Sequence, residues 1–247
     1  MRADLQEHTD RLQWVQDEID RLDEEVQAYL ETKPCEVRWH YDFSKNPPTR
    51  LYYPVEVSPP PKGVQIRTGT LINELRSILD ALACTLAARN GASQAAIKET
   101  YFPTAQSAAD YQSDPRIRRK IKHLFPADQL LIDNLRPYRG GNDLLFTLHS
   151  ADVLRKHQRL VLFANSLENI VVLPGIIDGA RLGRIGFEPG PVSRRPIIAE
   201  QPHDYHQPLD VSVTVTFAEP PWIEGKPISA TLRDFACEVK SALEVFH

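Results

Sequence analysis

A heptad pattern runs through the first thirty residues and constrains the fold most strongly. Apolar side chains and one histidine recur in alternating steps of three and four: Leu5, His8, Leu12, Val15, Ile19, Leu22, Val26 and Tyr29. Most other positions are Asp, Glu, Gln or Arg, which suits the exposed face of an amphipathic helix. The pattern predicts one long helix over residues 3–30. It favours a member of a helical bundle, with a dimeric coiled coil as the alternative.

After Cys35 the periodicity changes to that of β-strands. Val37, Trp39, Tyr41 and Phe43 alternate with polar residues, and a second apolar run follows the turn SKNPPT, which predicts a hairpin. Further short strands are predicted in the last third of the chain, in the segments VVLPGII, RLGRIGFE, RPIIAE and DVSVTVTFA. A helix with an apolar stripe is predicted to end the chain.

Two further helical stretches lie between these regions, at Leu71–Ala88 and Leu144–Phe163. Thr68 or Thr70 is the predicted N-cap of the first, and Asn142 or Asp143 that of the second. Two shorter helices are predicted over 116–125 and 126–135, the second with a proline in its first turn.

These elements predict an α+β fold with a helical bundle core of four or five helices packed with a small antiparallel sheet. A chain of 247 residues is long enough for one sizeable core, so we expect a single domain over 1–247. Its segments are expected in this order: the N-terminal amphipathic helix (1–33), the hairpin (35–66), the helical core (68–163), and the strands and C-terminal helix (168–247).

Composition excludes several classes of protein. The net charge of −4 gives no global basic field for nucleic acid. Cys35, Cys84 and Cys237 form no CxxC pair, which excludes a zinc ribbon or thioredoxin motif and fits a reducing compartment. The sequence shows neither a signal peptide nor an apolar run long enough for a membrane span. We therefore expect a cytoplasmic protein that does not enter the membrane.

Charged and titratable residues beside apolar helix faces are the candidate site residues, because burying such groups is costly unless they are paired or used. Arg76 and Asp80 are one turn apart at the margin of the first stretch. In the second, His157 shares a face with Phe146 and Val153, so it is either a general base or ligand, or a core histidine. His149 lies at the edge of that face, whereas Asp152, Arg155, Lys156 and Arg159 are expected to point outward or to its margin.

A metal site is a further hypothesis. If the first helix packs against the others, His8, Asp80 and His157 would supply two imidazoles and a carboxylate, a set that suits zinc or non-haem iron. No HExxH spacing supports this set. His203 and His206 lie close together in a loop, but no further ligand is spaced to complete a site. The cofactor is therefore unknown from the sequence.

The basic run Arg116–His123 is the densest in the chain and is a candidate contact to a nucleic-acid backbone. Runs of this kind are more often solvated helix faces. The pairs Arg76–Asp80 and Asp152–Lys156 are ordinary surface pairs if exposed. A buried Arg76 would instead offer a fixed fork for a phosphate or carboxylate.

Several short motifs follow one another along most of the chain. They are Leu75-Arg76-Ser77, Leu79-Asp80, Leu82, Phe102-Pro103, Pro137-Tyr138, Asp152, Lys156-His157 and Arg159. Their order resembles that of a group of uncharacterised bacterial proteins. Members of that group often carry His after the Leu-Asp pair, a spacing similar to the Arg-to-His motif of HEPN-superfamily helical bundles. Many HEPN proteins are metal-independent ribonucleases or inert relatives of them. Here Ala81 occupies the histidine position, so a nuclease using Arg76 would lack its partner.

Three hypotheses about function follow. The resemblance implies a HEPN-like protein that binds or processes RNA or nucleotides, or a catalytically degenerate relative. The second is a small-molecule enzyme with a cavity lined by His8, Arg76, Asp80, His149 and His157, with Lys156 nearby, acting on an anionic molecule. The third is a non-catalytic binding protein that forms a homodimer through its N-terminal helix. The sequence leaves open whether the chain is an enzyme.

Overall fold

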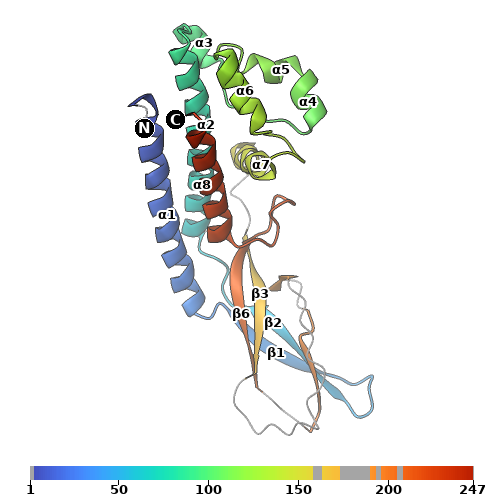
Figure 1. The fold of residues 1–247 in the computed structure, drawn as a ribbon. Coiled ribbons are helices and arrows are strands. Elements are labelled where there is room, and N and C mark those ends of the chain that lie inside the picture. The colour runs from blue at the N-terminus through green and yellow to red at the C-terminus, as the bar shows by residue number, and fades with distance from the viewer. Residues whose placement is uncertain (1–2, 158–162, 173–189, 193–195, 205–207, 247) are drawn as a thin grey trace. The chain divides into compact units, whose positions relative to one another are not determined.

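The computed structural model describes residues 3–157, 163–172, 190–192, 196–204 and 208–246, and it confirms the α+β fold (Figure 1). The chain divides into two compact units. The first comprises Met1–Asp23, Ile66–Val161 and Ser229–His247, and the second comprises Glu24–Gln65 and Leu162–Ile228. The sequence predicted a single domain over 1–247. The division into two compact units does not decide whether they form one domain, so that expectation stays a prediction.

The N-terminal helix is confirmed. A short 3-10 turn, Ala3–Leu5, leads into α1 (Gln6–Glu31). All eight residues of the heptad pattern are buried, none more than 8 % exposed. The apolar stripe therefore faces the protein along the whole length of α1, as the pattern predicted.

Helix α2 (Lys62–Arg89) begins earlier than predicted, so neither Thr68 nor Thr70 is its N-cap. Thr68 is fully buried within the helix, and the Thr70 hydroxyl bonds the carbonyl of Ile66 one turn back. The helix starts directly after three prolines, and the carbonyl of Pro61 accepts the N–H of Val64. Two glycines near its start lower the helix propensity there, which explains the late predicted start.

The other helices are α3 (Gln94–Lys98), α4 (Ala108–Ser113), α5 (Pro115–Arg119), α6 (Pro126–Asn134), α7 (Asp143–His157) and α8 (Ile228–Glu244). The described chain thus has eight α-helices, more than the four or five predicted, because the connection between α2 and α7 folds into four short ones. The predicted basic helix over 116–125 is limited to α5. Asn142 caps α7 as predicted, since its Oδ1 accepts the N–H of Leu145 at 3.1 Å.

Helix α7 differs from the prediction in length and in its buried face. The predicted helix over 144–163 reaches His157 in the described chain, and Phe163 already begins a strand. Asp152, expected to point outward or to the margin, is only 2 % exposed, whereas Val153, expected to point inward, is 40 % exposed. The buried face of α7 is therefore rotated by one residue relative to the predicted face, so that Asp152 and not Val153 lies in it. The ion pair with Lys156 stabilises the buried carboxylate of Asp152.

In the described part of the second unit, the strands form two small antiparallel sheets, where the sequence predicted one. In the first, β2 (Thr49–Glu56) lies between β1 (Cys35–Asp42) and β5 (Ala199–Pro202). In the second, β3 (Phe163–Val172) lies between β4 (Gly190–Pro191) and β6 (Leu209–Phe217). One buried cluster joins residues of both sheets: Cys35, Tyr52, Leu167, Val192, Ile198, Ala199 and Leu209.

The strand predictions were correct in part. The predicted hairpin, the strand at DVSVTVTFA and the C-terminal helix are confirmed. Strand β3 begins at Phe163, where the preceding helix was predicted to end, and thus eight residues before the predicted strand VVLPGII. The predicted strand RLGRIGFE lies outside the described residues.

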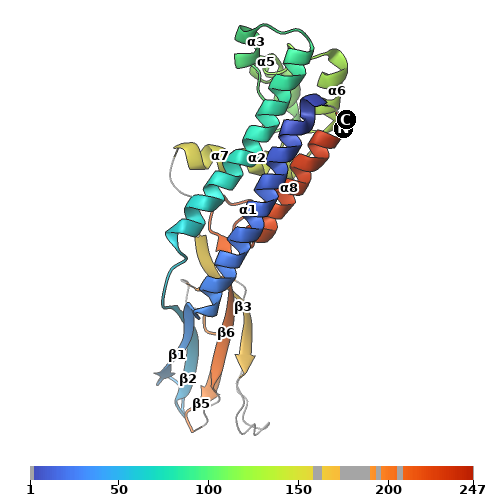
Figure 2. The ribbon, with the colours of Figure 1, turned by 90° about the vertical axis from the view of Figure 1, so that its left-hand side faces the viewer.

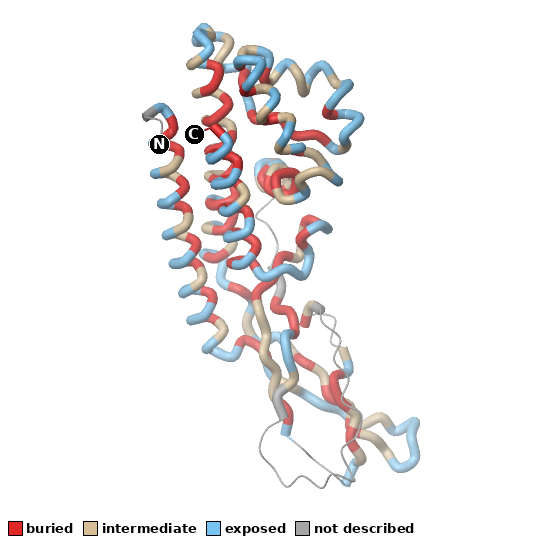
Figure 3. Tube along the Cα trace, viewed as in Figure 1, coloured by how far each residue is buried: buried red, intermediate tan, exposed pale blue. Residues whose placement is uncertain are grey.

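Within the first unit, α1, α2 and α8 run side by side (Figure 2). Their buried residues lie on the faces turned toward one another (Figure 3). Helix α2 also contacts α7 on another face, where Arg155 donates to the Asn73 side chain at 2.7 Å. This second contact of α2 holds the candidate site.

Candidate functional site

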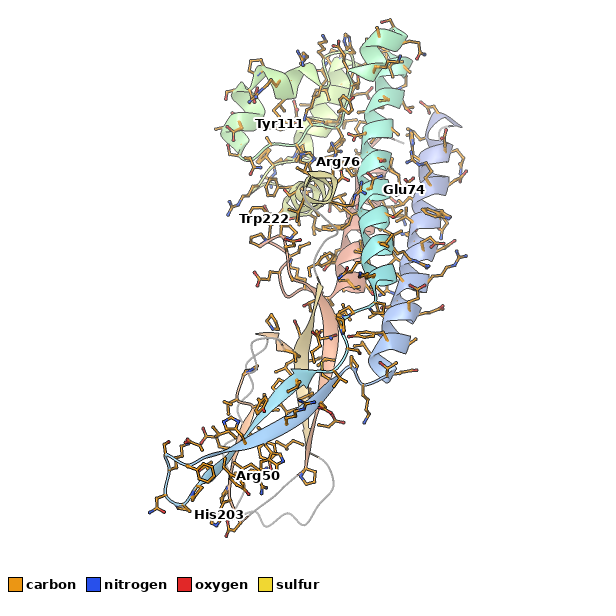
Figure 4. All side chains as sticks on the ribbon, turned by 180° about the vertical axis from the view of Figure 1, so that it is seen from behind. Arg50, Glu74, Arg76, Tyr111, His203 and Trp222 are labelled. Atoms are coloured by element: carbon orange, nitrogen blue, oxygen red, sulfur yellow. The ribbon has the colours of Figure 1, made fainter. Side chains whose placement is uncertain are left out.

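Arg76 lies at the centre of a buried polar cluster between α2 and α7, and Figure 4 shows it on the α7 side of α2. The residue is 5 % exposed. Its Nη2 donates to the Phe102 carbonyl at 2.7 Å and lies 2.9 Å from Asp80 Oδ1. Its Nε donates to His149 Nδ1 at 3.3 Å. Arg76 is therefore buried, which excludes the alternative of an exposed surface pair, and its role as an anion-binding fork stays a prediction.

Asp80, one turn after Arg76, ties the helix to the loop that precedes α4. Its Oδ1 accepts the N–H of Phe102 at 2.9 Å, while Arg76 binds the carbonyl of the same residue. Burial raises the pKa of Asp80, and the Arg76 charge opposes that shift. Phe102 is fully buried, so both of its backbone polar groups need the partners that Arg76 and Asp80 provide.

His149 extends the cluster onto α7 and is held as a neutral imidazole. Burial lowers its pKa to about 3, with further lowering by Arg76, Lys120 and Lys156. Because a guanidinium has no acceptor, Nδ1 accepts from Arg76 and the ring hydrogen resides on Nε2. His149 is therefore a fixed hydrogen-bond donor at neutral pH and a weak general base.

Two lysines add positive charge around this group. Lys120 is half-buried, and burial lowers its pKa, followed by the effect of Arg76. Lys156 binds the buried Asp152 at 2.5 Å. The cluster thus holds three cations, Arg76 and the two lysines, against the carboxylates of Asp80 and Asp152.

Two buried atoms of the cluster, the donor Arg76 Nη1 and the acceptor Asp152 Oδ1, lack a hydrogen-bond partner among the described residues. A buried guanidinium donor without an acceptor costs free energy. Together with the excess positive charge, this makes the surroundings of Arg76 suited to an anionic group or an electron-rich oxygen.

A hollow of about 320 Å³ opens beside His149 in the first unit. It lies between α7, the loop before α4, and helices α4 and α5, and its lining comprises Thr104, Ala105, Gln106, Asp110, Asp114, Arg116, Ile117, Phe146 and His149. The lining combines an aromatic ring, two carboxylates, one guanidinium and the neutral imidazole. A space of this size suits a small ligand with several polar groups.

His8 lies apart from this cluster. It is buried on α1, and its Nε2 lies 2.9 Å from the hydroxyl of Thr85. Burial lowers its pKa, with Arg11 the next cause. Asp80 has different partners, and the His157 side chain lies outside the description, so the metal set of His8, Asp80 and His157 stays a prediction. No three His, Cys, Asp or Glu side chains gather closely enough for a metal ion within the described residues.

Other predicted candidates take part in local contacts. In the basic run, Arg116 pairs with Asp114, Arg118 with Asp133 and Lys122 with Glu99. The exposed His203 accepts a 3.5 Å bond from Arg50 through its carbonyl, and His206 lies outside the described residues.

Lys120 was not predicted as a site residue from the sequence, and His149 was predicted only at the edge of the buried face. Lys120 was counted with the basic run, although its neighbours Ile117 and Ile121 already indicated a face turned toward the protein. The loop Thr104–Gln106 carried no motif. The Phe102-Pro103 pair before it was the available signal, because Phe102 anchors the loop to Arg76.

No protein-family model, curated protein or solved structure matched this chain. No described helix combines the length and apolar character that a membrane span requires.

Proposed function

We propose that this protein binds a nucleotide in the hollow beside His149, with the phosphate directed toward the Arg76 cluster. The observation that carries the proposal is the buried Arg76–His149 pair at 3.3 Å. It leaves the Nε2–H of His149, a residue that lines the hollow, as a donor and places the buried Arg76 guanidinium behind that ring. Preoriented donors of this kind favour phosphate oxygens.

The rest of the lining supports a ligand larger than phosphate alone. The half-buried Ile117 offers an apolar surface for a base at the hollow, beside the almost fully buried Phe146. Asp110 and Asp114 are acceptors for ribose hydroxyls or an exocyclic amino group. A nucleotide carries both an anionic end and hydrogen-bond donors, and so complements this mixed lining.

The HEPN resemblance supports the same proposal. The motif histidine expected on the Arg76 helix is replaced by Ala81, and His149 brings an imidazole to Arg76 from α7 instead. Because its pKa is lowered to about 3, this imidazole is poorly suited to remove a proton at neutral pH. We therefore propose binding rather than cleavage, in line with a catalytically degenerate relative.

The ion pairs of the basic run Arg116–His123 favour a nucleotide over a long RNA as the ligand. Three of its cations, Arg116, Arg118 and Lys122, are paired with carboxylates of the protein. An extended RNA would have to compete with these pairs. The hollow, in contrast, accommodates a single small ligand.

The test is calorimetric titration of the full chain with adenosine, guanosine, cytidine and uridine monophosphates. Saturable binding of at least one is expected. The change His149→Leu should weaken it about tenfold or more, because a hydrogen bond to a charged group is lost. The change Arg119→Gln, at an exposed residue outside the hollow, serves as the control and should leave affinity unchanged.

Absence of binding by all four would contradict the proposal. Tight binding of a single-stranded RNA that depends on Arg119 and not on His149 would favour the RNA hypothesis instead.

A further inference from the structure

A groove follows the contact between α1 and α8 in the first unit. Two adjoining hollows of about 300 and 330 Å³ share Gln16 and line up along both helices. Their floor is formed by four buried apolar residues: Leu12, Ile19, Ala236 and Leu243. Polar side chains such as Gln13 and Lys240 form the rim. This groove shares no residue with the Arg76 cluster or its hollow.

The α1 side of the groove is strongly acidic. Helix α1 contains nine Asp and Glu residues against two arginines. Asp10, Asp17 and Asp20 recur at spacings of seven and three, which places them on the edge that also carries Gln13 and Gln16. Arg233 of α8 pairs with Asp20 at 3.1 Å. The partners of Asp10 and Asp17 are the neutral amides of Gln6 and Gln13, so their negative charge remains uncompensated by those bonds.

We propose that this groove is a docking site for a basic amphipathic helix of a partner protein. Its apolar stripe would cover the floor between α1 and α8, and its lysine or arginine face would pair with Asp10 and Asp17. Amphipathic helices commonly bind grooves in this manner, and charge complementarity directs the encounter. A second copy of α1 is a poor occupant, because it brings the same excess of negative charge.

Cys237 provides a direct probe of occupancy. It lines the groove and is exposed, whereas Cys35 is buried and Cys84 half-buried. The probe ligand is a synthetic helix of about 18 residues, roughly 27 Å long, with leucines on one face and lysines on the other. The matched control peptide has glutamates in place of the lysines. Alkylation of Cys237 by N-ethylmaleimide is followed by mass spectrometry of the full chain.

The leucine–lysine peptide should slow alkylation about tenfold at about ten times its Kd, since mass action then leaves about a tenth of the grooves open. The glutamate peptide should have no effect. Protection should disappear in the double variant Asp10→Lys and Asp17→Lys. It should persist in the charge-matched variant Glu7→Lys and Asp234→Lys, whose changes lie on exposed residues outside the groove lining.

Three results would overturn the proposal. They are an unchanged alkylation rate with the leucine–lysine peptide, equal protection in both double variants, and protection that rises with protein concentration alone. The last would identify a second copy as the occupant and support the homodimer instead. Circular dichroism of both variants checks that the helices are intact.

Discussion

The two faces of helix α2 place a histidine in very different surroundings. On the α1 side, His8 is buried next to the hydroxyl of Thr85, and the neighbouring ion pair Arg11–Glu74 is partly exposed. On the α7 side, His149 contacts the buried Arg76 beside a hollow. Burial alone therefore does not mark a site. The α7 face is distinguished by excess positive charge and by space for a ligand. An unpartnered buried nitrogen occurs on both faces, since His8 Nδ1 and Arg76 Nη1 both lack a hydrogen-bond partner within the described residues.

The largest difference in stability between the two faces is expected when Arg76, on the α7 side, and Arg11, on the α1 side, are each replaced by methionine. Arg76→Met leaves the carboxylate of Asp80 without its buried cation, which should destabilise the protein by about 3–5 kcal/mol. Arg11→Met breaks a partly exposed pair, so a loss of about 1 kcal/mol or less is expected. Urea unfolding of both variants measures the difference. Equal losses would remove the distinction between the two faces.

The pH dependence of stability should reflect both histidines, and His149 more strongly. In the unfolded chain His149 has its ordinary pKa of 6.5, whereas in the folded protein it is lowered to about 3. Between these values the unfolded state binds more protons, so acid favours unfolding. Stability is therefore full above about pH 6.5 and falls by about 1.4 kcal/mol for each unit below it.

The variant His149→Gln should flatten that dependence more than His8→Gln does. The pKa of His8 is also lowered, so its contribution has the same sign. Denaturant midpoints between pH 4 and 8 provide the test. An unchanged slope in His149→Gln would show that this residue already titrates normally in the folded protein.

The capping of α7 should have a moderate effect. Asn142→Ala removes the acceptor for the Leu145 N–H and the bond from Asn142 Nδ2 to Glu238, at 2.6 Å. A loss of about 1 kcal/mol is expected for the cap. Ser113→Ala, at the exposed end of α4, is a control that should change stability by less than about 0.5 kcal/mol. Thermal unfolding of the two variants distinguishes them.

The smallest change in stability is expected from replacing glycines of α2 by alanine, and it tests how closely α7 approaches α2. At Gly63 an added methyl group would meet no atom within 4 Å, so Gly63→Ala should stabilise α2 by about 0.5–1 kcal/mol. At Gly69 the same group would lie 3.0 Å from the Arg155 side chain of α7. Gly69→Ala should therefore gain less or be destabilising. An equal gain at both positions would argue against the close contact of the two helices.

Periodicity predicted the elements with clear patterns and failed where packing decides. The heptad residues of α1 were assigned correctly, because their burial repeats along the sequence. Strands β1 and β6 were also predicted from alternating residues, although their burial does not alternate: Trp39 is exposed and Thr216 is buried. The start of α2 was missed, since helix-disfavouring glycines are tolerated there by the tertiary structure. Asp152 was placed outside because its buried state depends on Lys156 and Arg76.

The candidate site was predictable only in part for the same reason. Arg76 and Asp80 lie one turn apart, so their pairing followed from helical spacing. The contact of Arg76 with His149 joins residues 73 positions apart. It depends on how α7 crosses α2, which no local pattern encodes. The hollow also requires α4 and α5, whose short helices carry weak sequence signals.

The most direct test of the account is nitrogen-15 NMR of the imidazoles in histidine-labelled protein, with His149 assigned by comparison with His149→Gln. We predict that His149 remains neutral at pH 5, with its hydrogen on Nε2, and that the Nε2 resonance shifts when a nucleoside monophosphate is added. A His149 that titrates near pH 6.5, or that carries its hydrogen on Nδ1, would contradict the Arg76–His149 pair and the binding site built on it.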